Sequence, residues 1–265
     1  MTKEEVRKIV SQIKKYELVD SFKNREAAQK WLSSLNQKQI NNFISLKISC
    51  DEIAFPIDYL INSDLLNCDD YIDRIAAMSK IKNGVNYLFS MLCHPNFLNS
   101  KNYYKDLEKI SKAGTFKHAL WVITEDTFIN SPYHDEDLNL ILNAKDTDSD
   151  ADAYGDSLVA EALNMVAEDK NSINSPYHRQ DMRLIANSGS KCLQSSGCFP
   201  DRGINKLAIN EVSLKDRYHL ENMKLLSTDK VSREYLYLLM TDKSIVKDQN
   251  YRREISRLSK AKTKA

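Results

Sequence analysis

The chain repeats a short motif along most of its length, and this internal repetition restricts the possible folds more than any other feature. Residues 129–138 read INSPYHDEDL, and residues 173–182 read INSPYHRQDM. Weaker copies of the same template begin at residues 35, 66, 98, 214 and 246. Four of the six steps between copies are 31 or 32 residues, and two are 44 and 41 residues. A period of this length is typical of repeat proteins built from one supersecondary unit.

Each copy is expected to form two helices. The second helix begins at a residue whose side-chain oxygen can accept the free amides of the first turn. Five copies carry such a cap in the same register, namely Ser100, Ser131, Ser175, Asp216 and Asp248. Pro132 and Pro176 follow two of the caps directly, where proline is well tolerated. Apolar residues spaced by three, such as Leu138 and Ile141, then lie on one helix face.

The first helix of each copy is more apolar, as in residues 117–123 and 159–166, and is expected to be the buried member of the pair. A short loop such as residues 124–128 is expected to join the two helices. A pair of this size cannot bury its apolar face alone, so successive pairs must stack. The sequence therefore predicts an all-α fold, an α-solenoid of about six to seven two-helix repeats with a period of about 31 residues.

Composition agrees with a helical fold. The 265 residues include only 6 glycines and 5 prolines, too few for the frequent turns of β-sandwiches, barrels or propellers. No apolar run approaches the roughly 18 residues of a membrane helix, and the first twenty residues lack the apolar core of a signal peptide. No membrane attachment is therefore expected. The 5 cysteines include no Cys-x-x-Cys pair, which favours reduced thiols and a cytoplasmic location.

In period and layout the chain resembles the armadillo, HEAT, tetratricopeptide and pentatricopeptide class of repeat proteins. The predicted organisation is an N-terminal helical cap over 1–34, a repeat array over 35–258 and a basic, flexible tail over 259–265. The two long steps between copies place insertions in the array at 146–157 and 188–203. Terminal repeats commonly differ from central ones because they cap the stack.

A tyrosine recurs near the start of the second helix, and equal positions on a solenoid form a stripe. One interpretation is that each ring packs between adjacent repeats with its hydroxyl at the surface. The other is a ladder that binds an extended protein or peptide partner, because tyrosine supplies contact area at low entropic cost. The candidate partner-binding residues are Tyr71, Tyr103, Tyr133, Tyr177, Tyr218 and Tyr251.

Three histidines, His134, His178 and His219, follow the later tyrosines. Each occupies the place from which a capping-box side chain reaches back to the cap amide, so a structural role is expected. One repeat of separation, about 10 Å, is too far for a shared zinc ion. A polar residue also recurs three positions after each of these histidines. Its mostly acidic character suits backbone or interhelical hydrogen bonding better than the reading of nucleic-acid bases.

The charges sum to +1 but are unevenly distributed. Residues 124–181 carry 3 basic and 14 acidic groups, a net charge of −11, whereas residues 182–265 carry 17 and 9, a net charge of +8. The basic C-terminal third makes RNA or DNA binding the alternative function. The residues expected to carry it are Arg252, Arg253, Arg257 and Lys260. A solvated surface without a specific partner is the other interpretation.

The first insertion resembles the calcium loop of EF-hands. Oxygen-bearing side chains alternate through Asp150, Asp152 and Asp156, and Glu161 follows in the adjoining helix. Tyr154 stands where the EF-hand pattern has its third ligand, which lowers the expected affinity. A flexible, solvated acidic loop is the alternative interpretation.

The sequence contains no glycine-rich phosphate loop, nucleophile elbow or H-E-x-x-H motif. We therefore expect a non-catalytic helical-repeat scaffold that binds a protein or peptide partner along the surface of its second helices. No cofactor is expected apart from calcium at the acidic insertion.

Overall fold

The computed structural model shows an all-α protein, in which every regular element of the described residues is helical. The chain divides into two compact units, residues 1–114 and 115–265, which are described separately. None of the described helices is long and apolar enough to cross a membrane. The described residues are 33–45, 62–78, 91–113, 119, 122–144, 158–188, 203–228 and 233–260.

Unit 1 contains two pairs in which a one-turn helix precedes a longer one. These are α4 (Ser63–Leu66) with α5 (Tyr71–Met78) and α7 (Pro95–Leu98) with α8 (Tyr103–Lys112), preceded by α3 (Gln37–Ser45). The longer helices bury apolar residues three positions apart, because such residues share a helix face. Ile75 and Met78 of α5 are fully buried, and Leu107 and Ile110 of α8 are at most 2% exposed.

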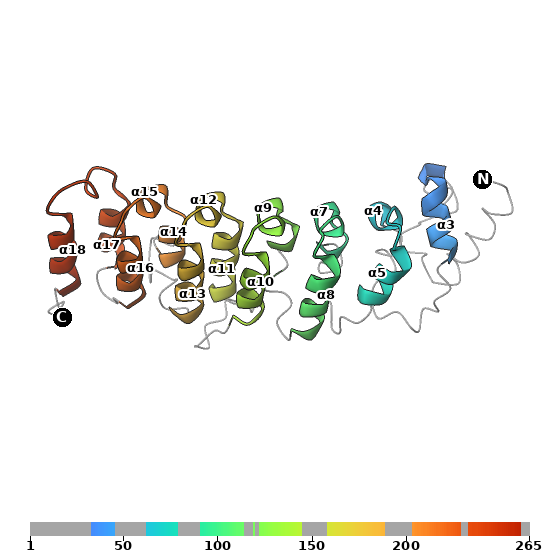
Figure 1. Ribbon diagram of the computed structural model, residues 1–265, viewed down its shortest axis with the longest axis horizontal. Coiled ribbons are helices and arrows are strands. Elements are labelled where there is room, and N and C mark those ends of the chain that lie inside the picture. The colour runs from blue at the N-terminus through green and yellow to red at the C-terminus, as the bar shows by residue number, and fades with distance from the viewer. Residues whose placement is uncertain are drawn as a thin grey trace, which may run out of the picture. The chain divides into compact units, whose positions relative to one another are not determined.

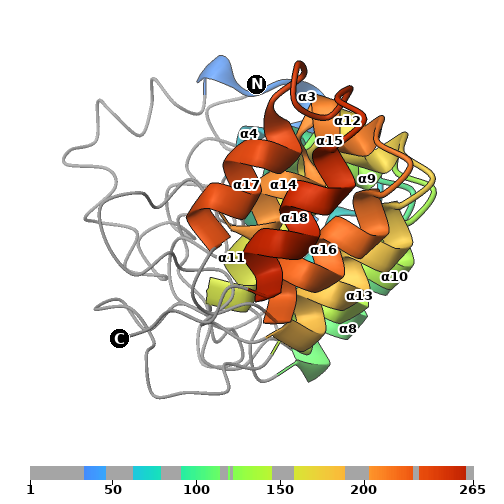
Figure 2. The same ribbon diagram turned by 90° about the vertical axis from the view of Figure 1, so that its left-hand side faces the viewer.

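Unit 2 arranges the same elements in two layers (Figures 1 and 2). One layer holds α10, α13, α16 and α18, the other holds α11, α14 and α17, and the one-turn helices α9, α12 and α15 lie along one edge. The bounds are η4 Val122–Thr124, α9 Asp126–Ile129, α10 His134–Leu142, α11 Leu158–Glu168, α12 Lys170–Ile173, α13 His178–Ser188, α14 Ile204–Ala208, α15 Glu211–Leu214, α16 His219–Thr228, α17 Arg233–Thr241 and α18 Tyr251–Lys260.

The core of unit 2 lies between these layers. Leu163 and Val166 of α11 have no exposed surface, as expected for the more apolar first helix. Across from them, the residues spaced by three on α10, α13 and α16 are also fully buried, since each pair faces the other layer. Burying one such side chain contributes roughly 1.5–3 kcal/mol of transfer free energy. The predicted apolar stripes are thereby confirmed.

The connection between the two helices of a pair differs from the prediction. A one-turn helix, α9, occupies residues 126–129, where a loop over 124–128 was expected. Related turns occur at α12 and α15, where Asp169 and Asn210 accept the free backbone amides of the turn. Four residues are too few for helix propensity to act alone, because helix nucleation is unfavourable. Caps and tertiary packing stabilise these turns, so periodicity could not reveal them.

The predicted caps of the second helices accept backbone amides, but they lie in turns before the helices, so the predicted helix starts are wrong. The N-cap residues of α8 and α10 are Asn102 and Tyr133, and neither makes a side-chain cap hydrogen bond. Each side-chain oxygen accepts the backbone N–H two residues later, and the helix itself begins one residue further on. The distances are 3.1 Å from Ser100 to Asn102, 3.1 Å from Ser131 to Tyr133, 3.1 Å from Ser175 to Tyr177, 3.0 Å from Asp216 to Tyr218 and 2.6 Å from Asp248 to Asn250.

Replacing one of these amide-accepting residues should weaken the protein measurably. Ser175→Ala removes the oxygen that accepts the Tyr177 amide, and we expect it to lower the free energy of unfolding by about 1 kcal/mol. Urea denaturation followed by circular dichroism measures the change. Asn187→Ala, an exposed change near the other end of α13, should have little effect. Equal stability of the two variants would contradict a stabilising role for this hydrogen bond.

Candidate functional site

The six candidate tyrosines do not occupy one structural position. The longer helices begin at Tyr71, Tyr103, His134, His178, His219 and Tyr251. Three of the tyrosines therefore share a position with the histidines, whereas Tyr133, Tyr177 and Tyr218 lie one residue earlier. The expectation of a single tyrosine column is wrong in this respect. Counting three residues from each cap would have given the correct register.

The two positions have different environments. Tyr71, Tyr103 and Tyr251 are core residues with exposed fractions of 0%, 2% and 3%. Their burial leaves them no surface for a partner, so the packing interpretation is correct for these rings. Its expectation of a hydroxyl at the surface is wrong for Tyr103 and Tyr251, whose hydroxyl groups are buried. Tyr133, Tyr177 and Tyr218 are half-buried. Only this second set combines ring area with access to solvent.

Two histidines of unit 2, His178 and His219, connect successive long helices of one layer, whereas Nδ1 of His134 lies 3.1 Å from the carbonyl of Phe128 in the preceding one-turn helix. His178 of α13 approaches Asp137 of α10 at 2.9 Å between Nε2 and Oδ2, and the other ring nitrogen lies 3.0 Å from the hydroxyl of Ser172. A carboxylate only accepts hydrogen bonds, so Nε2–H donates to Asp137, and Nδ1 accepts a hydrogen bond from the Ser172 hydroxyl. The expected bond from a histidine to the cap amide is therefore wrong. Both ring nitrogens of His178 bond elsewhere.

The next junction repeats this geometry. His219 of α16 lies 2.8 Å from Asp181 Oδ2 and 2.8 Å from Ser213 Oγ. The acidic residue three positions after each helix start thus makes an interhelical hydrogen bond, as the sequence suggested. At the last junction, Asn222 donates to the Tyr251 hydroxyl at 2.8 Å instead. Polar pairs of different chemistry therefore occupy one structural position.

Sequence reasoning missed the serines. Each is the third residue of a one-turn helix and precedes its histidine by six positions. In the pair α9 and α10 this position is Phe128, whose ring packs on His134 with centroids 4.5 Å apart. In α7 and α8 it is Phe97, which packs on Tyr103 at 4.9 Å. The recurring spacing of six is the signal that could have identified these contacts.

Ser172, His178 and Asp137 form a Ser-His-Asp arrangement without the features of a hydrolase site. All three are at most 1% exposed, so no substrate reaches the serine oxygen. The ring is also reversed, because hydrolases bond serine to Nε2 and aspartate to Nδ1. The arrangement serves packing between helices, and its repetition at His219 agrees with this role.

Desolvation acts on the carboxylates of these pairs. Burial raises the pKa of Asp137 and Asp181, although the hydrogen bonds from the histidines oppose the shift. The Oδ1 atom of each has no hydrogen-bond partner among the described residues. Burial with one unpartnered oxygen makes the ionised form of each carboxyl less stable than it is in water, which is the physical cause of the raised pKa.

Each half-buried tyrosine packs against a side chain at the start of the next long helix in the layer, not of the helix that it precedes directly. Tyr133 stacks on His178 with centroids 4.8 Å apart and planes inclined by 24°, and Tyr177 stacks on His219 at 4.8 Å and 25°. The Tyr218 ring lies 4.3 Å from the guanidinium of Arg252. We call Tyr133, Tyr177 and Tyr218 the tyrosine surface. Contact with the next helix holds each ring in place and leaves part of it exposed.

The candidate nucleic-acid residues are largely engaged within the protein. Arg252 pairs with Glu221 and donates to Asn222, and Arg257 pairs with Glu254 at 2.9 Å. Arg253 is exposed, and the side chain of Lys260 is outside the described residues. An arginine that forms an intramolecular ion pair must break it to bind a phosphate, which lowers its contribution to nucleic-acid affinity.

The calcium ligands are not brought together within the described residues. Asp150, Asp152 and Asp156 lie outside these residues, as does most of both predicted insertions. Glu161 is an exposed residue in the first turn of α11. Within the described ranges, no three His, Cys, Asp or Glu side chains could hold one metal ion. The calcium hypothesis therefore stays a prediction from sequence.

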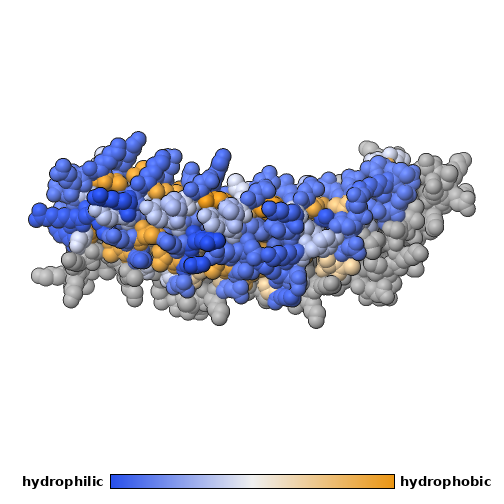
Figure 3. Space-filling model, viewed as in Figure 1, coloured by the Kyte–Doolittle hydropathy of each residue, from blue (hydrophilic) through white to orange (hydrophobic). Residues whose placement is uncertain are grey.

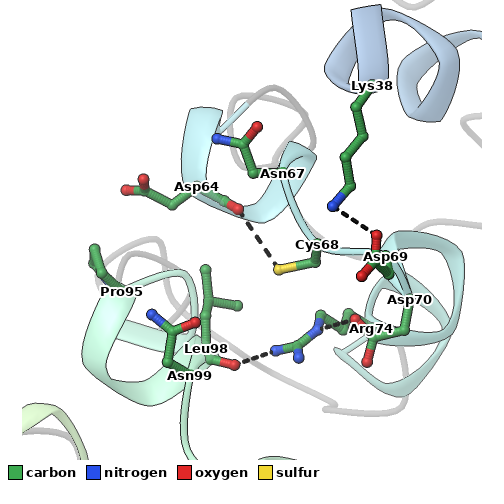
Figure 4. A pocket seen from close by; sticks show the side chains of 10 residues that line it. All are labelled: Lys38, Asp64, Asn67, Cys68, Asp69, Asp70, Arg74, Pro95, Leu98 and Asn99. Carbon is green, nitrogen blue, oxygen red and sulfur yellow. Dashed lines mark hydrogen bonds and ion pairs between the residues drawn. The ribbon is translucent and has the colours of Figure 1, made fainter. Parts of the chain in front are cut away.

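Unit 1 contains a polar pocket of about 620 Å³ around Cys68 and Arg74 (Figure 4). Arg74 donates to Asp70 at 2.6 Å and to the carbonyl of Leu98 at 2.8 Å. Burial raises the pKa of the Cys68 thiol, which lies 3.6 Å from the carbonyl of Asp64. Cysteine reacts as the thiolate, so this environment disfavours nucleophilic chemistry.

The chain matches no protein-family model, no curated protein sequence and no solved structure.

The buried polar pairs should be energetically coupled. We expect Asp181→Ala and His219→Ala each to lower the free energy of unfolding by about 3 kcal/mol, since each leaves a buried polar partner unsatisfied. A double-mutant cycle should give a coupling energy of about 1–3 kcal/mol. Gln180→Ala, an exposed change on the same helix, is the matched control. Additive effects would show that the pair does not stabilise the junction.

The raised pKa of Asp181 also predicts a pH dependence. Folding makes this carboxyl bind its proton more tightly than in the unfolded chain, so its contribution to stability falls as pH rises above its ordinary value of 3.8. Wild-type protein should therefore lose stability relative to Asp181→Asn in urea titrations at increasing pH. Hydrogen bonds from Ser244 and the Ile245 amide lower the pKa of the exposed Asp242, so comparison with Asp242→Asn should give the opposite sign.

Proposed function

We propose that the chain is an α-solenoid scaffold without catalytic activity that binds a protein or peptide partner through the tyrosine surface. Support for the repeat architecture comes from the recurring order of a one-turn helix and a longer helix. It comes also from the same polar contact at successive junctions of unit 2, His178 to Asp137 and His219 to Asp181. Stacked units that contact their neighbours in one way are typical of solenoids.

The observation that carries the binding proposal is the tyrosine surface itself. Its three half-buried rings lie at equivalent positions before α10, α13 and α16, which stand side by side in one layer (Figures 1 and 2). The exposed prolines Pro132 and Pro176 adjoin two of them. Elsewhere this face is mostly hydrophilic, with hydrophobic residues visible between the polar ones (Figure 3). Aromatic area within a polar surround is typical of binding surfaces.

The rings are also held in place before a partner arrives. Tyr133 and Tyr177 each stack on a buried histidine that two further hydrogen bonds orient. A preordered side chain loses little rotamer freedom on binding, so more of its contact energy appears as affinity. Regular spacing along one layer suits a partner that contacts several repeats in extended conformation.

The proposal predicts the effect of removing two rings. Tyr133→Ala with Tyr177→Ala should weaken the binding of a partner about tenfold or more, because central aromatic residues contribute most to such interfaces. Affinity capture from the native host, with mass spectrometry and nucleic-acid sequencing of the bound material, identifies the partner. Titration of the purified partner then measures the affinity.

The double variant Asn139→Ala with Asn187→Ala changes exposed side chains on the same two helices and is the matched control. Loss of each stacked ring is expected to lower the free energy of unfolding by about 0.5–1.5 kcal/mol in addition to the effect of its buried area. Thermal unfolding measures this loss of stability and so separates it from a loss of binding. A tyrosine variant that retains full affinity would contradict the proposal, as would one whose loss of binding is explained entirely by unfolding.

A further inference from the structure

Unit 2 has a groove of about 660 Å³ at its C-terminal end, beside Tyr218. One wall is formed by α15 and the residues that lead into α16, and the other by residues 243–249 and the start of α18. Val212 and Val246 supply half-buried apolar surface. Because Tyr218 belongs to the tyrosine surface, the groove continues that surface at one end. A volume of this size suits a few residues of peptide.

The groove walls carry an excess of positive charge. Five basic residues line the groove, Lys215, Arg217, Lys243, Lys247 and Arg252, against three acidic ones, Glu211, Asp216 and Asp248. It also lies in the basic part of the chain, residues 182–265, with a net charge of +8.

The three acidic residues are already engaged within the protein. Asp216 is 6% exposed and accepts hydrogen bonds from Asn222 at 3.0 Å and from the Tyr251 hydroxyl at 3.1 Å. Glu211 pairs with Lys215 at 3.2 Å. Asp248 accepts the amide of Asn250 at 2.6 Å. Of the three, Glu211 forms an ion pair, and its partner is Lys215 rather than one of the other groove cations.

Three cations of the groove remain available to a ligand. Arg217, Lys243 and Lys247 are exposed, and the described part of the chain places no carboxylate within ion-pair distance of them. The guanidinium of Arg217 lies 4.7 Å from the centroid of the Tyr218 ring, which holds it at the groove wall. Anionic groups of a ligand would find cations already positioned there.

We infer that this groove binds an acidic peptide segment of the partner, with carboxylates facing Lys243, Lys247 and Arg217 and an apolar side chain between Val212 and Val246. The inference rests on the proposed function and specifies the chemistry of the partner. Charge complementarity and apolar wall area together favour a mixed acidic and apolar peptide over a free anion, which would use only the cations.

Two observations favour a peptide over a nucleic acid. Two guanidinium groups, those of Arg217 and Arg252, already lie against the Tyr218 ring, which competes with base stacking. Arg252 is held by Glu221 and Asn222 rather than presented to a phosphate.

The test selects ligands from a phage-displayed library of random linear peptides on the immobilised full chain. The selected sequences, made as fluorescein-labelled peptides, are titrated by fluorescence anisotropy at low and at physiological ionic strength. We expect them to be enriched in Asp and Glu beside apolar residues, and to bind more weakly as salt rises. Single-stranded oligo-dT is titrated in parallel as the nucleic-acid probe.

Charge reversal then locates the site. Lys243→Glu with Lys247→Glu should weaken peptide binding about tenfold or more. Lys101→Glu with Lys170→Glu makes the same change in net charge at exposed residues outside the groove, and should change affinity less than twofold. Circular dichroism melts verify that both variants fold.

Each remaining outcome counts against a defined statement. The selected peptides could lack acidic enrichment, and their binding could be unaffected by the reversal at Lys243 and Lys247 but weakened by loss of Tyr133 and Tyr177. This result would overturn the acidic-peptide inference and leave the proposed function standing. Failure to select any peptide would overturn the acidic-peptide inference, whereas the proposed function is decided by the affinity capture and the tyrosine variants. Tighter binding of oligo-dT than of any peptide, lost on the same lysine reversal, would identify the groove as a nucleic-acid site.

Discussion

The buried hydrogen bond from the first residue of one long helix to the carboxylate of the preceding helix is the constraint on which unit 2 depends. His178 and His219 make this bond to Asp137 and Asp181, with donor–acceptor distances of 2.9 and 2.8 Å. Taking such groups out of water is costly unless the partners meet in good geometry. If neighbouring helices shifted relative to one another, both groups would be buried without a hydrogen-bond partner. The pairs therefore specify the alignment of these helices. Apolar packing alone tolerates small displacements more easily.

The same bond connects the core to the exposed face. Each histidine is oriented on both sides of its ring, so it presents a rigid plane on which the preceding repeat's tyrosine stacks. At the last junction Tyr251 and Asn222 replace the histidine and the aspartate, and Arg252 covers Tyr218 in place of an imidazole. That change in chemistry coincides with the basic groove. The tyrosine surface and the basic groove therefore both depend on which residue occupies the buried first position of the long helix that follows.

Much of the local structure followed from short-range patterns. The apolar pairs three residues apart and the acidic position suited to hydrogen bonding were predicted correctly. Ser131 and Ser175 accept backbone amides as expected, but in turns that precede the helices rather than as their caps. The one-turn helices were missed because four residues carry no periodicity. The tyrosine alignment was wrong because matching residue identity placed Tyr133 with Tyr103, whereas the distance from the cap places His134 there.

The sequence by itself determined the helical class, the amide-accepting residues before the long helices and the buried stripes, because these depend on interactions within a few residues along the chain. Only the tertiary structure decided which aromatic residues are buried and which remain at the surface. That outcome depends on partners far apart in sequence, such as Asp137 for His178 and Arg252 for Tyr218. It likewise decided that Ser172, His178 and Asp137 form a closed packing contact, since burial of all three excludes a substrate from a catalytic-looking set of residues.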